Sequence, residues 1–448
     1  MRQELADSRK ESSDLRRQMD EMRAQLQALR GDSPAAAGVP VLTPEQLTEE
    51  HELLAAKVDD QYQTKVESSS KYRVKLSGMA LFTAGLTQGA VNNLDLPGYA
   101  EERAPGDSAG ALTATLRQSI FGLDVEGPVW MGAKTSGEIR ADFFGAMPSV
   151  ADGVTTGYVR LRTARLGMDW KNTSIEVGQT SPFFSPLTPT SLISTAYPAM
   201  WNSGNLWAWT PQVNVTHKFG RPDATRFVLQ YGVLDALTGS VPVDEYSREA
   251  SAGERTRTPA TAVRVGTERT TAHGKASAGA GFYYSRQNWG FSRRVDSWAA
   301  TADWELPLGR YFTLSGELYR GRAIGGLGGG AGLTTLLSDS VNKMSTRVLP
   351  VESGGGWAQL KIKPAQRWEF NAAYGGDFPL RGSIPTFPAI FSAEEYKPAR
   401  NASGTANIIY QPRNNLLFSI EYRRLWTSPF DEPQHRAHHI GIGAGILF

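Results

Sequence analysis

The chain ends on the stretch RAHHIGIGAGILF, Arg436 to Phe448, and this stretch decides the fold. From Ile440 onward an apolar side chain occupies every second position, and the positions between them are mostly glycine. Such alternation is typical of a strand with two different faces, because successive side chains point to opposite sides. A long apolar strand with an unpaired edge invites aggregation, so we expect this one to be paired. It could be the last strand of a soluble sandwich or the closing strand of a barrel.

The same alternation recurs throughout the chain from Tyr72 onward, and sixteen segments show it in all. After Tyr72–Phe82 the segments are Phe121–Val125, Ile139–Phe143, Val159–Leu161, Ile175–Val177, Val213–Val215, Phe227–Val233, Val263–Val265, Ala276–Tyr284, Trp298–Trp304, Phe312–Leu318, Ala358–Ile362, Trp368–Tyr374, Ala406–Tyr410, Leu416–Tyr422 and the C-terminal stretch.

The connections between these segments alternate strictly between short and long. The short ones carry turn residues and fall near 127–128, 171–172, 220–223, 273–274, 307–309, 364–366 and 412–414. The long ones run roughly over 89–110, 146–156, 181–208, 235–258, 287–294, 322–354, 377–399 and 427–435. A sandwich gives no reason for this alternation, whereas a bacterial outer-membrane barrel is built in this way. The sequence therefore predicts an all-β fold, a 16-stranded antiparallel transmembrane β-barrel over residues 72–448.

Charged side chains in these segments fall on the parity opposite to the apolar one. Examples are Arg140, Arg160, Arg423, Glu317 and Glu421. A charge facing lipid at the membrane midplane costs about 2–4 kcal/mol, so the charged face is expected to face a water-filled lumen. Arg165 breaks the rule in its segment, and either a bulge or a position near the membrane rim would explain it. Aromatic residues that we expect to form a girdle at the strand ends are Tyr284, Trp298, Trp304, Tyr410, Tyr422 and Trp426.

Composition excludes several classes of protein. The 448 residues contain no run that approaches the roughly 18 apolar residues of a spanning helix. Lys and Arg (47) nearly balance Asp and Glu (45), so a nucleic-acid partner is not expected. We find no nucleophile–histidine arrangement and no phosphate-binding loop, and therefore expect neither an enzyme nor a cofactor. His435, His438 and His439 could ligate a metal, but a solvated strand end is the favoured interpretation and no metal is expected.

The N-terminal region has helical periodicity. Residues 1–30 carry an a/d seam, which predicts a coiled coil with copies of the same chain, a frayed and disordered tail being the alternative. The seam residues are Leu15, Met19, Met22, Leu26 and Leu29. Residues 31–71 are expected to form a linker and a short amphipathic helix that begins at the N-cap Thr43. Charged residues follow Met1 directly, so an exported form would be a processed or truncated chain.

The third long connection differs from the others. Ser181 to Trp209 reads SPFFSPLTPTSLISTAYPAMWNSGNLWAW and has no charged residue. A segment this apolar is expected to pack against something. We expect it to fold into the barrel as a constriction loop over about 181–208; the alternative is packing over a neighbouring subunit. Its aromatic residues are Phe183, Phe184, Tyr197, Trp201, Trp207 and Trp209.

Several short motifs resemble the DcaP-like family of trimeric outer-membrane porins. They are the N-terminal heptads, RQSIFGLDVEGP (Arg117–Pro128), GEIRADFFG (Gly137–Gly145), YVRLR (Tyr158–Arg162) and EVGQTSPFF (Glu176–Phe184). The terminal phenylalanine is similar to the assembly signal of such barrels. The resemblance implies a homotrimer in the bacterial outer membrane, with N-terminal helices in the periplasm, that passes small anionic solutes such as dicarboxylates. It also implies that Arg160 and Arg162 are lumen arginines.

Two classes of function remain open from the sequence. The first is a porin for passive diffusion of small hydrophilic, preferentially anionic solutes, with Arg140, Arg160, Arg162 and Arg117 lining the pore. A sugar-selective porin is the alternative within this class, since the loop aromatics could stack on sugar rings. The second is a structural protein whose coiled coil ties the outer-membrane lipid layer to the cell wall.

Deleting residues 1–40 is expected to leave the barrel folded but to weaken the homotrimer. The seam residues need partners, which only other copies of the chain would supply. The measurement is the temperature at which the trimer dissociates on a gel, compared between the full and shortened chains. An equally heat-resistant shortened trimer would show that the coiled coil does not contribute.

Overall fold

The computed structural model describes residues 73–146, 157–221, 224–236, 238–239, 249–380, 398–430 and 433–448. The chain divides into a unit of residues 1–67 and a unit of residues 68–448. The expected coiled coil and amphipathic helix of residues 1–71 lie outside the described residues. Over the described ranges, no helix has the length and apolar character needed to cross a membrane.

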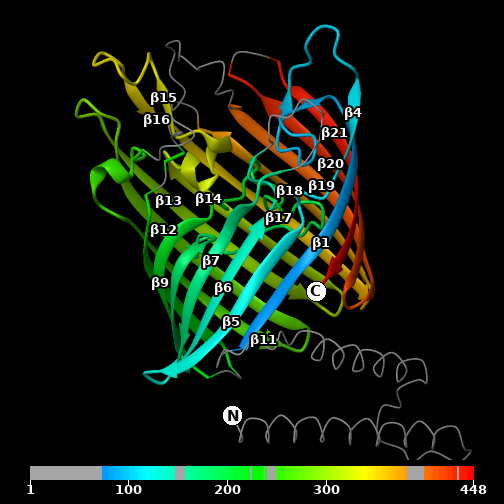
Figure 1. Ribbon diagram of the computed structural model, residues 1–448. Helices are drawn as coiled ribbons and strands as arrows, with labels where there is room; N and C mark the ends of the chain where they lie inside the picture. The colour runs from blue at the N-terminus through cyan, green and yellow to red at the C-terminus, as the bar shows by residue number, and fades with distance from the viewer. Residues whose placement is uncertain are drawn as a thin grey trace, which may run out of the picture. The chain divides into compact units, whose positions relative to one another are not determined.

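The described residues form a closed antiparallel β-barrel (Figure 1). Each wall strand pairs with its neighbours in sequence, and the last pairs with the first. The wall strands are β1 (Arg73–Gln88), β4 (Gly110–Thr115) with β5 (Ile120–Trp130), β6 (Ala133–Asp142), β7 (Arg160–Asp169), β8 (Thr173–Thr180), β9 (Thr210–Phe219), β10 (Arg226–Leu234), β11 (Ala260–Thr271), β12 (Gly274–Asn288), β13 (Arg294–Leu308), β14 (Phe312–Arg322), β17 (Glu352–Ala365), β18 (Trp368–Pro379), β19 (Arg400–Arg413), β20 (Leu416–Ser428) and β21 (His435–Leu447). Because β4 and β5 together make one strand, the seventeen described sheet strands form a sixteen-strand wall, which confirms the predicted barrel.

Closure depends on the C-terminal stretch. Strand β21 pairs with β1 from Met79↔Leu447 to Gln88↔His438. Beyond the ladder, the backbone N–H of Gly78 donates to the carbonyl of Phe448 at 2.9 Å, and Phe448 N–H donates back at 3.1 Å. A transmembrane sheet needs this pairing, because lipid offers no partner to an open edge.

The two faces of the wall differ as the alternation predicted. On β1, Leu76 and Phe82 are exposed on the outside, whereas Leu81 is fully buried on the inside. On β21, Ile440 and Ile442 are exposed, whereas His439, which has the opposite parity, is buried. The apolar parity therefore forms the outer surface and the polar parity faces the interior.

One short connection lies at a different position from the expected one. The first short connection was expected at Gly127-Pro128, but the strands continue past it with a register irregularity between Glu126 and Val129. The turn comes at Met131 and Gly132, whose φ angles of 49° and 77° match the left-handed conformations of a two-residue hairpin turn. Proline is tolerated in a strand at such an irregularity, which explains its position here.

A bulge explains Arg165. The β6–β7 register shifts between Arg140↔Thr163 and Ala141↔Leu161, so β7 carries one extra residue at Arg162. An extra residue reverses the alternation beyond it. Arg160, Arg162 and Arg165 consequently all face inward, and the bulge rather than a rim position accounts for Arg165.

Smaller elements lie in the long connections. Described ones are the hairpins β2 (Ala90–Val91) with β3 (Ala100–Glu101) and β15 (Thr335–Leu337) with β16 (Val348–Pro350), and the 3-10 turns η1 (Glu254–Thr256), η2 (Gly325–Leu327) and η3 (Gly330–Gly332).

Replacing Gly78 by valine is expected to destabilise the closure by about 1–3 kcal/mol, as overpacked sites generally do. A Cβ at this position would lie 2.5 Å from the carbonyl oxygen of Ile120 and 2.6 Å from the Phe448 ring, so backbone must shift. The readout is the temperature of heat-induced unfolding on a gel. The matched control is Ala80→Val, two residues along on the same exposed face. Equal unfolding temperatures for the two variants would contradict the close packing at Gly78.

Candidate functional site

The segment Ser181–Trp209, here called loop 3, crosses the barrel interior. Its backbone and hydroxyls hydrogen-bond to inward-facing side chains of four wall strands on its way. Ser185 Oγ and Leu187 N–H both donate to Glu317 of β14 at 2.7 Å. Thr190 N–H donates to Gln359 of β17 at 2.6 Å, and the Thr190 carbonyl accepts from Asn407 of β19 at 2.9 Å. Loop 3 therefore spans the lumen instead of lying over the outer face.

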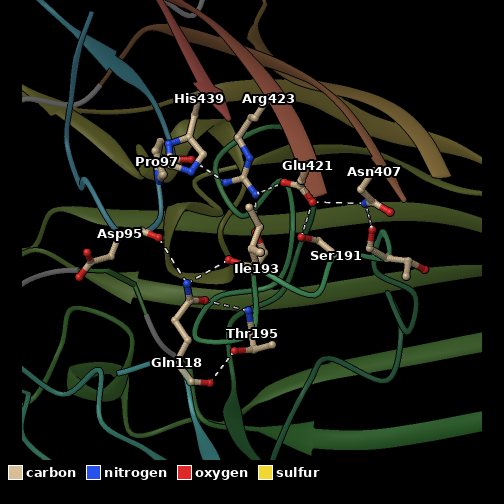
Figure 2. A network of polar contacts seen from close by, with 12 residues as sticks. Asp95, Pro97, Gln118, Ser191, Ile193, Thr195, Asn407, Glu421, Arg423 and His439 are labelled. Atoms are coloured by element: carbon tan, nitrogen blue, oxygen red, sulfur yellow. Dashed lines mark hydrogen bonds and ion pairs between the residues drawn. The ribbon is translucent and has the colours of Figure 1, made fainter. Parts of the chain in front are cut away.

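The middle of loop 3 is held by a polar network (Figure 2). Ser191 Oγ donates to Glu421 of β20, whose carboxylate also accepts from Arg423 at 2.7 Å. Arg423 donates in addition to Ser194 Oγ and, at 2.9 Å, to the carbonyl of Pro97 in the first long connection. Glu421 and Arg423 are almost fully buried, so their charges are compensated by each other and by loop backbone.

Gln118 anchors the return of loop 3 toward β6 and β7. This side chain is fully buried in the break between β4 and β5. Its Nε2 donates to the carbonyl of Ile193 at 3.0 Å, and its Oε1 accepts from the N–H groups of Thr195 and Ala196 at 3.0 and 3.3 Å. One amide thus satisfies three backbone groups of loop 3 that would otherwise be buried without partners. Figure 2 shows the contacts of Gln118 with Ile193 and Thr195.

Five of the six aromatic residues of loop 3 divide into two groups. Phe183 and Phe184 are buried where the loop leaves β8, and Phe184 stacks on Tyr283 of β12 with ring centroids 5.3 Å apart. They attach the loop to the wall and do not face open space.

The second aromatic group lies where three long connections meet. Tyr197 stacks on Trp201 at 4.8 Å and meets Trp207 edge-on at 5.0 Å. Trp201 packs against Gly98 of the first long connection. The backbone N–H of Trp207 donates to the carbonyl of Leu327, in the glycine-rich connection between β14 and β17, at 3.1 Å. Beside them, burial and then the charge of Glu101 raise the pKa of Tyr99 to about 12, so this phenol stays neutral.

Arg160 and Arg162 of β7 share one carboxylate. Arg160 binds Asp142 at the end of β6 through two hydrogen bonds of 3.1 and 2.7 Å, while Arg162 Nε lies 3.5 Å from the same carboxylate. Asp142 is fully buried. Arg162 Nη1 has no hydrogen-bond partner among the described residues. Two guanidinium groups against one carboxylate leave an excess of one positive charge here.

Rings of loop 3 cover these guanidinium groups. Arg160 lies over Tyr197 at 4.7 Å and over Trp209 at 5.3 Å, and Arg162 lies over Trp209 at 4.9 Å. Arg160 also donates to the carbonyl of Ala196 at 2.7 Å. Cation–π contacts and a backbone acceptor fix the guanidinium positions without neutralising their charge.

The other two predicted pore arginines are placed differently. Arg140 pairs with Asp124 at 2.7 Å and lies 3.7 Å from Glu138, deeper toward the short turns. Arg117 is buried between β4 and β5, pairs with Asp95 of the first connection and lies over Phe144 at 4.4 Å. Arg117 therefore ties a loop to the wall, and Arg160 and Arg162 are the ones brought together against loop 3.

The three clustered histidines do not converge. His439 faces inward and hydrogen-bonds Thr87 Oγ1 at 2.9 Å, whereas the ring of His438 contacts Tyr422 Oη on the outside at 2.6 Å. Over the ranges that the structure describes, no group of three metal-ligating side chains comes together.

Sequence reasoning missed most of the groups that hold loop 3. Glu317, Glu421 and Arg423 were expected to face the lumen but not to bind loop 3. No role was predicted for the neutral amides Gln118 and Gln359. An uncharged loop that crosses a polar lumen must find donors and acceptors for its own backbone. Amides at inward-facing positions were the available signal.

A closed antiparallel barrel of sixteen strands, polar inside and apolar outside, with a long loop folded across its interior, is the fold of a bacterial outer-membrane porin.

Solved structures agree with this class. The chain is similar to the outer-membrane channel DcaP of Acinetobacter baumannii, at 18% identity and a TM-score of 0.62 over 86% of this chain and 100% of that one. It is also similar to an anion-selective porin from Comamonas acidovorans, at 11% identity and a TM-score of 0.52 over 84% and 100% of the two chains. No protein-family model and no curated protein sequence matches the chain. The predicted resemblance is thus confirmed for the fold, and these neighbours are channels rather than enzymes.

Replacing Gln118 by leucine is expected to loosen loop 3 beside Arg160. The change removes the partners of buried backbone groups at Ile193, Thr195 and Ala196, each worth about 1–3 kcal/mol when left unsatisfied. We expect faster proteolytic cleavage within 181–209 and noisier single-channel currents. Gln411→Leu is the control, because Gln411 is a half-buried amide near the end of β19 and donates to the carbonyl of Asn414 in the adjoining short turn. Unchanged cleavage and current noise in Gln118→Leu would contradict the anchoring role.

Proposed function

We propose that this protein is a porin for passive diffusion of small hydrophilic solutes and that it favours anionic, dicarboxylate-like ones. The observation that carries the proposal is the pair of guanidinium groups on Arg160 and Arg162 that share the single carboxylate of Asp142. Loop 3 faces them and contains no charged residue, so it adds no opposing acid.

A second cationic cluster toward the short turns supports the same preference. Around Glu268 lie Lys275 at 2.9 Å, Lys218 at 3.0 Å and Arg226 at 3.8 Å, on the inner faces of β9 to β12. Three cations against one carboxylate leave an excess of two positive charges. An anion would therefore meet positive potential twice in the pore, once beside Arg160 and Arg162 and once beside the cluster around Glu268.

The size of the preference follows from Coulomb's law. One unpaired charge about 8 Å from a permeating ion contributes roughly 0.5–1 kcal/mol, for a dielectric between bulk water and half that value. This corresponds to about a two- to sixfold preference for a monovalent anion over a neutral solute of the same size. Salt screens the interaction, so the preference should weaken as ionic strength rises.

Two alternatives have observations of their own. The rings of Tyr197, Trp201 and Trp207 could stack on sugars, but they already stack on one another. The tethering alternative rests on the predicted coiled coil, which also supports the proposal of a homotrimer with periplasmic N-terminal helices. A purely structural barrel would carry no current in a planar bilayer.

Charge selectivity tests the proposal. In a low-salt KCl gradient we expect an anion-selective reversal potential, and in liposomes faster entry of succinate than of its neutral isostere succinamide. Replacing both Arg160 and Arg162 by serine is expected to remove most of both preferences, since the shared Asp142 would then be unopposed.

Arg286→Ser is the control, because this arginine lies near the rim on the outer face beside Asp296. A cation-selective wild type would refute the proposal. So would unchanged selectivity in the double variant. Faster entry of sugars than of succinate would favour the sugar-porin alternative.

A further inference from the structure

A group of arginines lies on the outer face of the barrel, near its long-loop end. Arg400 begins β19, Arg424 lies near the end of β20, and Arg436 lies near the start of β21. Each is adjacent in sequence to a buried residue that faces inward. These neighbours are Asn401, Arg423 and Ala437, respectively. The three arginines therefore point toward the surroundings of the barrel and not into its lumen.

The strand register brings these arginines together. Arg424 is opposite His438, and Arg436 is opposite Trp426, which places the two arginines on a diagonal of adjacent strands. Arg400 is opposite Ser428 on the other side of β20, four residues along that strand from Arg424. With a rise of about 3.3 Å per residue and about 5 Å between strands, the three Cα atoms lie within roughly 14 Å of one another, a span that long side chains and a headgroup with more than one phosphate can bridge.

These arginines have no acidic partner among the described residues. The lumen arginines differ, since Arg160 and Arg423 each bind a carboxylate. Arg320, which faces outward near the same end of the barrel, also has an acidic partner, because it lies 3.7 Å from the carboxylate of Glu352. Concentrated positive charge on a lipid-facing surface is costly unless the surroundings supply anions.

Aromatic rings fix the depth of the guanidinium groups. Arg424 lies over Trp426 at 5.0 Å, and Arg400 lies over Phe378 at 5.5 Å. Tyr374 meets the Trp426 ring at 6.2 Å and is itself exposed on the outer face. Exposed aromatic rings at strand ends mark the membrane–water interface, so the arginines lie at the level of lipid headgroups.

We propose that Arg400, Arg424 and Arg436 form a binding site for the phosphate groups of a lipid headgroup in the leaflet on the long-loop side. Guanidinium groups bind phosphate through paired, charge-assisted hydrogen bonds, and three of them match a headgroup that carries more than one phosphate. The rings of Trp426 and Phe378 offer apolar contact to the adjoining lipid. The site lies outside the lumen and is independent of the proposed solute preference.

The test is lipid binding by the full chain in detergent, measured by native mass spectrometry. The probes are lipid A, a glycolipid with two phosphates, and the same lipid after removal of both phosphates. Wild type is expected to retain lipid A at least tenfold more strongly than the dephosphorylated lipid. The triple variant Arg400→Gln, Arg424→Gln, Arg436→Gln is expected to lose that difference, while Arg320→Gln keeps it as the matched outward-facing control.

Several outcomes would overturn the assignment. The assignment is wrong if wild type retains lipid A and the dephosphorylated lipid equally. It is also wrong if the triple variant still retains lipid A more strongly to the same extent as wild type. Displacement of lipid A by inorganic phosphate alone would point to a site for free anions. A changed oligomeric state with unchanged lipid binding would make the arginines a subunit contact. Bilayer conductance of the triple variant should equal that of wild type, which verifies folding and separates this test from the one for solute selectivity.

Discussion

The structure depends on the pairing of its last strand with its first. Lipid offers no hydrogen-bond partner, so a spanning sheet is stable only when no edge remains. The glycine-rich inner face of β21 and the mutual backbone bonds of Gly78 and Phe448 meet this requirement. In the closed wall, successive side chains of each strand face lipid and the lumen in turn. The charged side chains of the strands therefore lie mainly in the lumen.

That interior is then filled by the chain itself. Loop 3 carries no charge, yet it lies against a wall rich in charged and amide side chains, because its backbone groups supply the partners that these side chains need. Buried acids and bases compensate one another at Glu421 and Arg423. At Arg160 and Arg162 the compensation is incomplete, and the remaining charge distinguishes this point of the lumen from the rest of the network.

The fold could be predicted from the sequence to a large extent, because a two-residue period and alternating connection lengths are local signals. The positions of Arg160 and Arg162 followed from the same period. The role of Arg117 did not, because it depends on Asp95 of a connection whose path no local pattern specifies. The anchors of loop 3 were hidden for the same reason: Gln118 and Glu421 meet the loop through contacts 75 to 230 residues apart in the chain. Bulges were foreseen only at Arg165, where a charge on the wrong parity revealed one.

The long separation between loop 3 and its anchors has a consequence for the order of assembly. Ser191 and Ser194 are bound by β20, whose residues Glu421 and Arg423 come about half the chain later. Contacts that close such long loops form late, since the entropy of closure must be met before they stabilise anything. A barrel that has acquired its early strands but not β20 and β21 therefore lacks the two side chains that hold the middle of loop 3, Glu421 and Arg423. The middle of loop 3 therefore takes its final position only when the last strands complete the wall.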